Sequence, residues 1–335
     1  MPHKAPYSFL WLQAASCGGC SAAALGSDPS FLDGGTPRLN PLAHQAVSEE
    51  CGAEFTQILN AVLDGGLVLD GLLVEGAVLN GPNGTGQFQM APGMGRPMNR
   101  LIADLAEKAR HVVAVGSCAA FGGVVAGLGS RTQAVGLQYD GGEAGGLLGA
   151  GWRSKSGLPV VNVAGCAPHP GWIVETLLLL ADGALAPNDL DSFQRPSFFA
   201  DHLAHHGCNR NEYYEYKASA HDPSQQGCLM ENLGCRATQA PGDCNRRRWN
   251  GAGSCTNAGY ACIACTVPGF ASSADPFLET PKLAGIPVGL PVDMPKAWFV
   301  ALAALSKSAT PSRVRRNATE SRIAVPPDSR SRKPK

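Results

Sequence analysis

The sequence is poor in charge, and it has no long hydrophobic run. Only 16% of its 335 residues are charged, which is well below the roughly 25% that is usual for soluble chains. No apolar stretch approaches the length of a membrane-spanning helix, so we expect no membrane span of its own. The formal net charge is zero, and therefore gives no reason to expect nucleic acid as a partner.

No targeting segment precedes the first cysteine. The chain starts Met-Pro-His-Lys and passes at once into the apolar residues 7–12. This stretch is too short for a membrane span and lacks a small-residue cleavage site. We therefore expect a cytoplasmic protein, or one peripheral to the inner face of the membrane.

Cysteine is what the chain has in excess, with 12 residues. Thiols stay reduced in the cytoplasm, where disulfides are rare. The count therefore points to metal or redox clusters. The plainer alternative is a set of scattered buried thiols with one or two disulfides.

The zero net charge conceals a basic C-terminal tail. Residues 307–335 carry nine lysines and arginines against Glu320 and Asp328, a balance of +7, which leaves −7 for residues 1–306. This tail is also rich in proline and serine, a composition that cannot build a core. We expect it to be disordered, and docking on an acidic partner is the alternative.

The first half of the chain reads as alternating strands and helices. Apolar runs typical of strands buried on both faces of a parallel sheet occupy residues 9–13, 72–78, 111–116 and 159–164. Helical patterns lie between or after them at residues 47–64, 97–109 and 171–180. This order predicts an α/β fold with an open parallel sheet.

The second half changes character. Residues 191–270 show little periodicity but contain seven of the twelve cysteines. A stretch this irregular needs more than a hydrophobic core to hold it, and metal binding can supply the folding free energy. Residues 294–305 then look like a short amphipathic helix. We expect an α/β domain over residues 1–190, an irregular cluster-binding domain over 191–306 and the tail over 307–335.

Four cysteines of the first half follow predicted strands. Cys17 and Cys20 form a Cys-Gly-Gly-Cys motif after the first, and Cys118 and Cys166 follow the third and fourth. Open α/β folds place ligands at this carboxyl edge of the sheet. Four thiolates suit zinc or an iron–sulfur cluster equally, and a lone Cys-x-x-Cys could be a redox pair. Four thiols from separate strand ends favour a metal.

The irregular half offers eight soft ligands, enough for two sites of four. They are His205, Cys208, Cys228, Cys235, Cys244, Cys255, Cys262 and Cys265. Structural zinc fingers are a poor match because the early ligands are widely spaced.

These motifs together resemble one family, the small subunits of nickel–iron hydrogenases, over roughly residues 7–270. The matching stretches include Trp11-Leu12 with Cys17-Gly-Gly-Cys20, Val74-Glu75-Gly76, Gly116-Ser-Cys118-Ala-Ala-Phe-Gly-Gly123 and Asn162-Val-Ala-Gly-Cys166-Ala-Pro-His-Pro170. Those of the second half are His205-His-Gly-Cys208-Asn-Arg210, Cys228-Leu-Met-Glu-Asn-Leu-Gly-Cys235, Gly242-Asp-Cys244 and Cys262-Ile-Ala-Cys265.

The resemblance implies a flavodoxin-like domain and three iron–sulfur clusters in a line. Cys17, Cys20, Cys118 and Cys166 would hold a proximal [4Fe-4S] cluster beside the partner's nickel–iron centre. A distal [4Fe-4S] cluster would be held by His205, Cys208, Cys228 and Cys235. The medial cluster would lie between them on Cys244, Cys262 and Cys265.

The medial set departs from many relatives, in which the cluster is [3Fe-4S] and a proline stands where a fourth ligand could be. This sequence has Cys255 at that position. A fourth thiolate would retain the fourth iron, so we predict a medial [4Fe-4S] cluster with a lower reduction potential. The alternative is [3Fe-4S] with Cys255 as a free thiol.

Three other features also distinguish this chain. Gly19 and Gly123 stand where relatives with an oxygen-tolerant proximal cluster have two extra cysteines, so we do not expect tolerance of that kind. One additional residue between Cys228 and Cys235 predicts a bulged loop. Cys51 matches no ligand position, and we expect it to be a buried thiol.

The implied activity is that of a hydrogen-uptake nickel–iron hydrogenase, in which this chain is the electron-transfer subunit of a heterodimer. We identify no nickel ligand and no catalytic residue in it, and Glu75 is better explained as structural than as a proton carrier. The partners would be the nickel–iron large subunit and an electron acceptor, either a redox protein or a quinone-linked carrier.

Three other readings of the sequence stay open. A regulatory, hydrogen-sensing hydrogenase shares this subunit plan. A cluster-bearing subunit like that of respiratory complex I resembles only the first half, and a multi-zinc binding protein is more remote.

Overall fold

The computed structural model describes residues 5–28, 36–127, 129–249, 251, 253–272 and 278–321, which form two compact units. The first unit comprises Met1–His202, Trp249–Ala252 and Cys265–Asp275. The second unit comprises Leu203–Arg248, Gly253–Ala264 and Pro276–Lys335.

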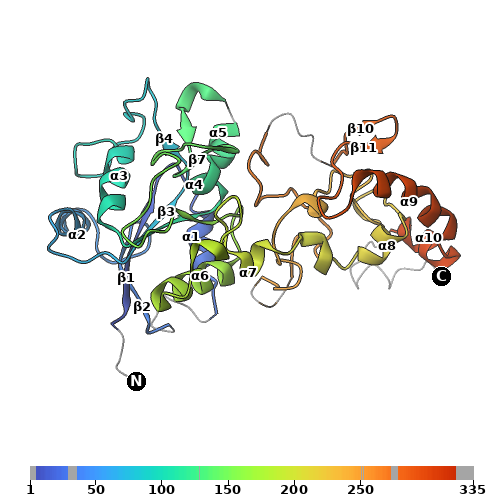
Figure 1. Ribbon diagram of the computed structural model, residues 1–335, viewed down its shortest axis with the longest axis horizontal. Helices are drawn as coiled ribbons and strands as arrows, with labels where there is room; N and C mark the ends of the chain where they lie inside the picture. The colour runs from blue at the N-terminus through green and yellow to red at the C-terminus, as the bar shows by residue number, and fades with distance from the viewer. Residues whose placement is uncertain are drawn as a thin grey trace, which may run out of the picture. The chain divides into compact units, whose positions relative to one another are not determined.

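A five-stranded parallel sheet forms the centre of the first unit (Figure 1). Its strands are β1 (Tyr7–Gln13), β2 (Leu39–His44), β3 (Gly71–Glu75), β5 (His111–Val115) and β9 (Val161–Val163). They are ordered β2-β1-β3-β5-β9, and every neighbouring pair is parallel. Counted within the sheet, this is the order 2-1-3-4-5 of flavodoxin-like folds. The predicted open parallel α/β sheet is confirmed.

Helices cover both faces of this sheet. On one face, α2 (Ala53–Leu63) and α3 (Met98–Lys108) share a hydrophobic core with Leu10, Leu72 and Val112. Side chains alternate along a strand, so Phe9 and Trp11 point to the opposite face. There, α1 (Gly19–Leu25) contacts α6 (Pro170–Asp182), which also contacts β9.

Short elements complete the first unit. They are β4 (Val78–Leu79), α4 (Ser117–Phe121), α5 (Gly123–Gly127), η1 (Ser130–Thr132), β6 (Ala134–Val135), β7 (Tyr139–Asp140), β8 (Glu143–Ala144), η2 (Pro187–Asp189) and α7 (Ser197–Ala200). Pairing is antiparallel between β4 and β6 and between β7 and β8.

The second unit is held by several small hydrophobic clusters. Its elements are η3 (Ala204–Gly207), α8 (Asn211–Glu215), η4 (Ala237–Gln239), β10 (Lys282–Leu283), β11 (Ile286–Pro287), α9 (Lys296–Ala309) and α10 (Ser312–Ala318). One cluster joins Tyr214, Met230 and Phe299, with Cys228 and Cys235 packed against it. Two predicted ligands, Cys228 and Cys235, thus take part in the apolar packing of this unit.

The prediction of a disordered tail from residue 307 is wrong for residues 307–321. Helix α9 continues to Ala309, and α10 follows. Val314 and Ala318 are buried on α10 and pack against Tyr213 and Ala218. Two apolar residues four positions apart give this basic segment one face that can dock. Residues 322–335 lie outside the described residues.

Within the part of the chain that the structure describes, no helix has both the length and the apolar character needed to cross a bilayer.

Candidate metal centres

Three strands of the first unit deliver four cysteines to one edge of the sheet. Cys17 and Cys20 lie between β1 and the first turn of α1, Cys118 lies in α4 directly after β5, and Cys166 follows β9. The chain order reverses between β1 and β3, and this is where open α/β sheets bind ligands. We call these four residues the proximal set.

The four thiols of the proximal set influence one another electrostatically. Burial raises the pKa of Cys20, and the neighbouring Glu75, Cys118, Cys166 and Cys17 raise it further. Burial is also the main reason that the pKa values of Cys118 and Cys166 are raised. Thiolates brought together in this way need a cation to offset their charge, and a metal centre supplies it.

Two glycines lie so close to the proximal thiols that a side chain at either position would collide with a sulfur atom. A Cβ atom at position 116 would lie 2.5 Å from the Sγ of Cys20, and one at position 123 would lie 2.7 Å from the Sγ of Cys118. Both Gly116 and Gly123 also have positive φ angles, 90° and 49°, which side chains rarely adopt. A cysteine at position 123 would therefore require the backbone to move.

Glu75 fixes the loop that carries Cys17 and Cys20. This carboxylate is fully buried at the end of β3. It accepts hydrogen bonds from the backbone N–H groups of Cys20 and Ser21, both at 3.1 Å, and from Trp11 Nε1 at 3.1 Å. The hydroxyls of Ser16, at 2.7 Å, and Ser21 also donate to it. With this many donors already bound, Glu75 acts as a structural carboxylate.

A pair of hydrogen bonds joins the loops of Cys118 and Cys166. The Ser117 N–H donates to the Gly165 carbonyl at 2.9 Å, and the Gly165 N–H donates to the Ser117 hydroxyl at 2.9 Å. The thiols of Cys17 and Cys166 belong to exposed residues. The proximal set thus fits a four-thiolate metal group that reaches the protein surface.

A second candidate site lies in the second unit. His205, Cys208, Cys228 and Cys235 line one small cavity, together with Arg210 and Tyr214. Burial, together with the neighbouring Cys235 and Cys208, raises the pKa of Cys228 to about 12. We call His205 and these three cysteines the distal set.

His205 is oriented for ligation. Its Nε2 lies 3.1 Å from the Oδ2 of Asp293, which also lies 2.9 Å from the Nε2 of His206. Its Nδ1 is buried and has no hydrogen-bond partner among the described residues. Burial lowers the pKa of His205, against the opposing effect of Asp293. A neutral imidazole with one nitrogen anchored by a carboxylate and the other free is a typical metal ligand.

Asp293 was not anticipated from the sequence. It lies 88 residues from His205, so no spacing motif connects the two. His205, His206 and Asp293 also bring their ligand atoms close enough to hold a metal ion themselves. The three thiols beside His205 favour the larger distal set.

The extra residue between Cys228 and Cys235 is accommodated in a turn. The N–H groups of Leu233 and Cys235 donate to the Leu229 carbonyl at 2.9 and 3.4 Å. Gly234 has a φ of 69°, a value that glycine adopts without strain. Both cysteines therefore still reach the same cavity.

The predicted medial ligands are divided between the two units. Cys244, Cys255 and Cys262 belong to the second unit, and Cys265 belongs to the first. Within the second unit, Asn245 Oδ1 accepts hydrogen bonds from the hydroxyls of Ser254 and, at 2.8 Å, Thr256. These hydrogen bonds hold Ser254 and Thr256, which flank Cys255, next to Asn245, which directly follows Cys244.

The distal set is linked to one of the predicted medial ligands, Cys262. The backbone N–H of Cys262 donates to the Sγ of Cys235 at 3.4 Å, and the Arg236 N–H donates to the Cys262 carbonyl at 2.8 Å.

Cys51 lies apart from these sets in the sequence and is exposed, which corrects the expectation that it is buried. It sits at a turn before α2, where Gly52 has a φ of 54°.

Comparisons with known families divide the chain in the same way. Residues 17–180 match the family described as NADH ubiquinone oxidoreductase, 20 Kd subunit. Residues 200–278 match the family described as the C-terminal part of the NiFe/NiFeSe hydrogenase small subunit. The second match distinguishes this chain from the complex I protein, which was expected to resemble the first half alone.

Relatives that match over most of the chain are hydrogenase subunits. The F420 non-reducing hydrogenase II small subunit of Methanosarcina mazei is 31% identical over 322 residues, which cover 89% of this chain and 81% of the relative. The actinobacterial-type NiFe-hydrogenase structure from Ralstonia eutropha H16 has a TM-score of 0.73 at 29% identity, covering 93% of this chain and 94% of that one. A recombinant [NiFeSe] hydrogenase structure from Desulfovibrio vulgaris Hildenborough has a TM-score of 0.71 at 29% identity, with coverages of 83% and 99%.

The chain belongs to the small subunits of nickel–iron hydrogenases. It is therefore a component of a hydrogenase, of a family whose small subunits carry iron–sulfur clusters. The resemblance found in the sequence is confirmed.

Proposed function

We propose that this chain conducts electrons from a nickel–iron large subunit to an external acceptor during hydrogen uptake. The observation that carries the proposal is the grouping of ligands into one set at the sheet edge of the first unit and one set around His205 in the second unit. Cys244, Cys255, Cys262 and Cys265 are the ligands proposed for the medial cluster. Iron–sulfur clusters bound to these residues would supply one-electron transfer in sequence from proximal to medial to distal.

The residues of the chain would set where each cluster sits and how readily it is reduced. Glu75 and the Ser117–Gly165 pair hold the proximal thiols in place. The exposure of Cys17 and Cys166 is what a cluster facing a large subunit requires. The proposal includes four cysteine ligands for the medial cluster, and therefore [4Fe-4S] rather than [3Fe-4S].

The distal set has a neutral imidazole in place of one thiolate. Removing one negative charge from the ligand shell raises a cluster's reduction potential. A higher potential favours the transfer of electrons to the distal cluster. A redox protein or a quinone-linked carrier would then accept the electrons from this cluster. Residence in the cytoplasm stays a prediction, which cell fractionation tests.

Co-purification with a nickel-containing large subunit, followed by a hydrogen-uptake assay with benzyl viologen as acceptor, tests the proposal. We expect turnover that depends on both subunits and a brown protein containing iron and sulfide. Zinc in place of iron would contradict it. Very slow turnover together with a bound kinase would instead identify a hydrogen sensor.

A further inference from the structure

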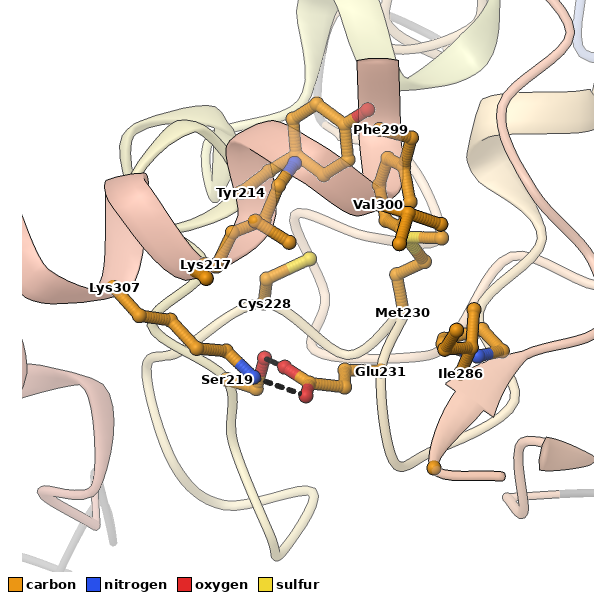
Figure 2. A pocket seen from close by; sticks show the side chains of 14 residues that line it. Tyr214, Lys217, Ser219, Cys228, Met230, Glu231, Ile286, Phe299, Val300 and Lys307 are labelled. Atoms are coloured by element: carbon orange, nitrogen blue, oxygen red, sulfur yellow. Dashed lines mark hydrogen bonds and ion pairs between the residues drawn. The ribbon is translucent and has the colours of Figure 1, made fainter. Parts of the chain in front are cut away.

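The second unit contains an open pocket of about 270 Å³ beside the distal set (Figure 2). Helix α9 forms one wall with Phe299, Val300, Ala303 and Ala304, and the two alanines leave space that larger side chains would fill. The volume is at the small end of ligand-binding cavities. It is large enough to receive a ring system.

The pocket shares a wall with the distal set. Cys228, Tyr214 and Met230 line both this pocket and the small cavity around His205. A molecule in the pocket would therefore contact a predicted cluster ligand directly. This shared wall is what separates the pocket from an ordinary surface hollow.

The pocket contains one cation that is held by aromatic rings. The Nζ of Lys217 lies 3.8 Å from the centroid of the Tyr214 ring and 4.5 Å from that of Phe299. Among the described residues, no carboxylate forms an ion pair with it. Lys217 is half-buried, and its φ of 52° is uncommon for a residue other than glycine. Its N–H donors are therefore available to an oxygen atom of a ligand.

The other lysine of the pocket is already engaged. Lys307 forms an ion pair with Glu231 at 2.5 Å, and Glu231 also accepts a hydrogen bond from the Ser219 hydroxyl at 2.5 Å. Figure 2 shows this polar group on one side and Lys217 with the two aromatic rings on another. The remaining lining is apolar, and Ile286 and Val300 are 38% and 43% exposed.

We propose that this pocket binds a quinone-type electron acceptor, whose ring lies against the apolar wall and whose carbonyl oxygen accepts a hydrogen bond from Lys217. This inference rests on the proposed function, because the electrons come from hydrogen. A cluster held by the distal set would supply two electrons to the quinone, one at a time, and two protons from water would convert its two carbonyl oxygens to hydroxyls. Hydrogen oxidation releases the same numbers of electrons and protons, so the reaction balances.

The test uses the holo-complex of both subunits and menadione, a small naphthoquinone that lacks an isoprenoid tail. Lys217→Met removes the ammonium group, and Val300→Trp fills the pocket. Lys296→Met and Leu305→Trp are the matched controls, because both residues lie on α9 outside the pocket lining and are exposed. We expect the KM for menadione to rise about tenfold in each pocket variant and to change less than twofold in the controls. The rate of benzyl viologen reduction by each variant corrects its menadione rate for differences in cluster content.

Menadione binding to the oxidised complex, measured by calorimetry without hydrogen, separates the two proposals. Saturable binding that Val300→Trp abolishes is expected. An active complex that does not bind menadione, or a Val300→Trp variant with an unchanged KM, would overturn the pocket proposal and leave the proposed function standing. Binding without any dye reduction would overturn the proposed function instead. Loss of electron transfer only to a protein acceptor would show that the pocket serves a protein and not a quinone.

Discussion

At the scale of single residues, the medial site depends on Cys255. Cys255 is exposed, and hydrogen bonds to Asn245 hold its two neighbours. If its thiolate retains the fourth iron, the oxidised protein has no [3Fe-4S] signal in EPR. We expect Cys255→Pro to produce that signal and to raise the medial reduction potential. A strong [3Fe-4S] signal in the unmodified oxidised protein would show that Cys255 is not a ligand. Cys51→Ser is the control, because Cys51 is an exposed cysteine outside the predicted sets.

His205 gives a second prediction at this scale. Its buried Nδ1 has no hydrogen-bond partner among the described residues, and Asp293 anchors its Nε2. His205→Cys would add one negative charge to the distal ligand shell. We expect the cluster to be retained with a potential lower by roughly 100 mV, measured by an EPR-monitored redox titration.

The control for His205→Cys is His206→Gln. His206 is bound to the same Asp293 oxygen at 2.9 Å, but it does not line the distal cavity. An equal shift in both variants would mean that the effect is transmitted through Asp293 and that His205 is no ligand.

At the scale of elements, the sequence predicts four of the five sheet strands and misses one edge strand, β2. The runs that became β3 and β5 are fully buried, so they are continuously apolar and easy to recognise. β2 was not predicted because Pro41 interrupts it, and proline in sheets is confined to edges and irregularities. β2 is an edge strand, and its pairing with β1 shifts register directly after Pro41.

Other boundaries depended on local geometry that the residue pattern does not encode. The helix expected from residue 47 begins at Ala53, after Gly52 in a positive-φ conformation. Helix α1 was hidden because it starts inside the Cys-Gly-Gly-Cys motif, at Gly19. The ends of the predicted strands indicated the proximal grouping, and the family resemblance implied the distal one, while Asp293 and the Lys217 pocket come from contacts distant in sequence.

Helix α10 gives the prediction that belongs to this scale. Val314 is fully buried against Tyr213, Ala218 and Ala318. Val314→Asp would bury an unpaired carboxylate at a cost of the order of 3 kcal/mol, and we expect α10 to undock. Trypsin should then cut at Arg313, Arg315 and Arg316 much faster than in the unmodified protein.

Ser312→Asp is the matched control for α10. It introduces the same charge at an exposed position at the start of the helix, where a carboxylate is favourable. Equal cleavage of the unmodified protein and Val314→Asp would show that residues 312–318 are not docked in solution.

At the scale of the whole molecule, the two units differ in what stabilises them. The first unit has a continuous core in which strands β1, β3 and β5 pack against α2 and α3. In the second unit, the clusters that involve predicted ligands contain four, three and three buried residues. Ligand cysteines take part in all three through Cys228 and Cys235.

This difference predicts how each unit responds to removal of iron. Because metal binding supplies folding free energy where apolar burial is small, the second unit should lose structure when its clusters are chelated anaerobically. The sheet of the first unit should keep its fold, because its apolar burial does not depend on the cysteines. Hydrogen exchange followed by mass spectrometry would show lost protection in residues 203–248 and retained protection in β1, β3 and β5. Cys228→Ser, which affects only the distal set, should reproduce the loss in the second unit without chelation. Similar exchange of residues 203–248 before and after iron removal would contradict a stabilising role for the clusters and would imply that the small apolar clusters of this unit suffice.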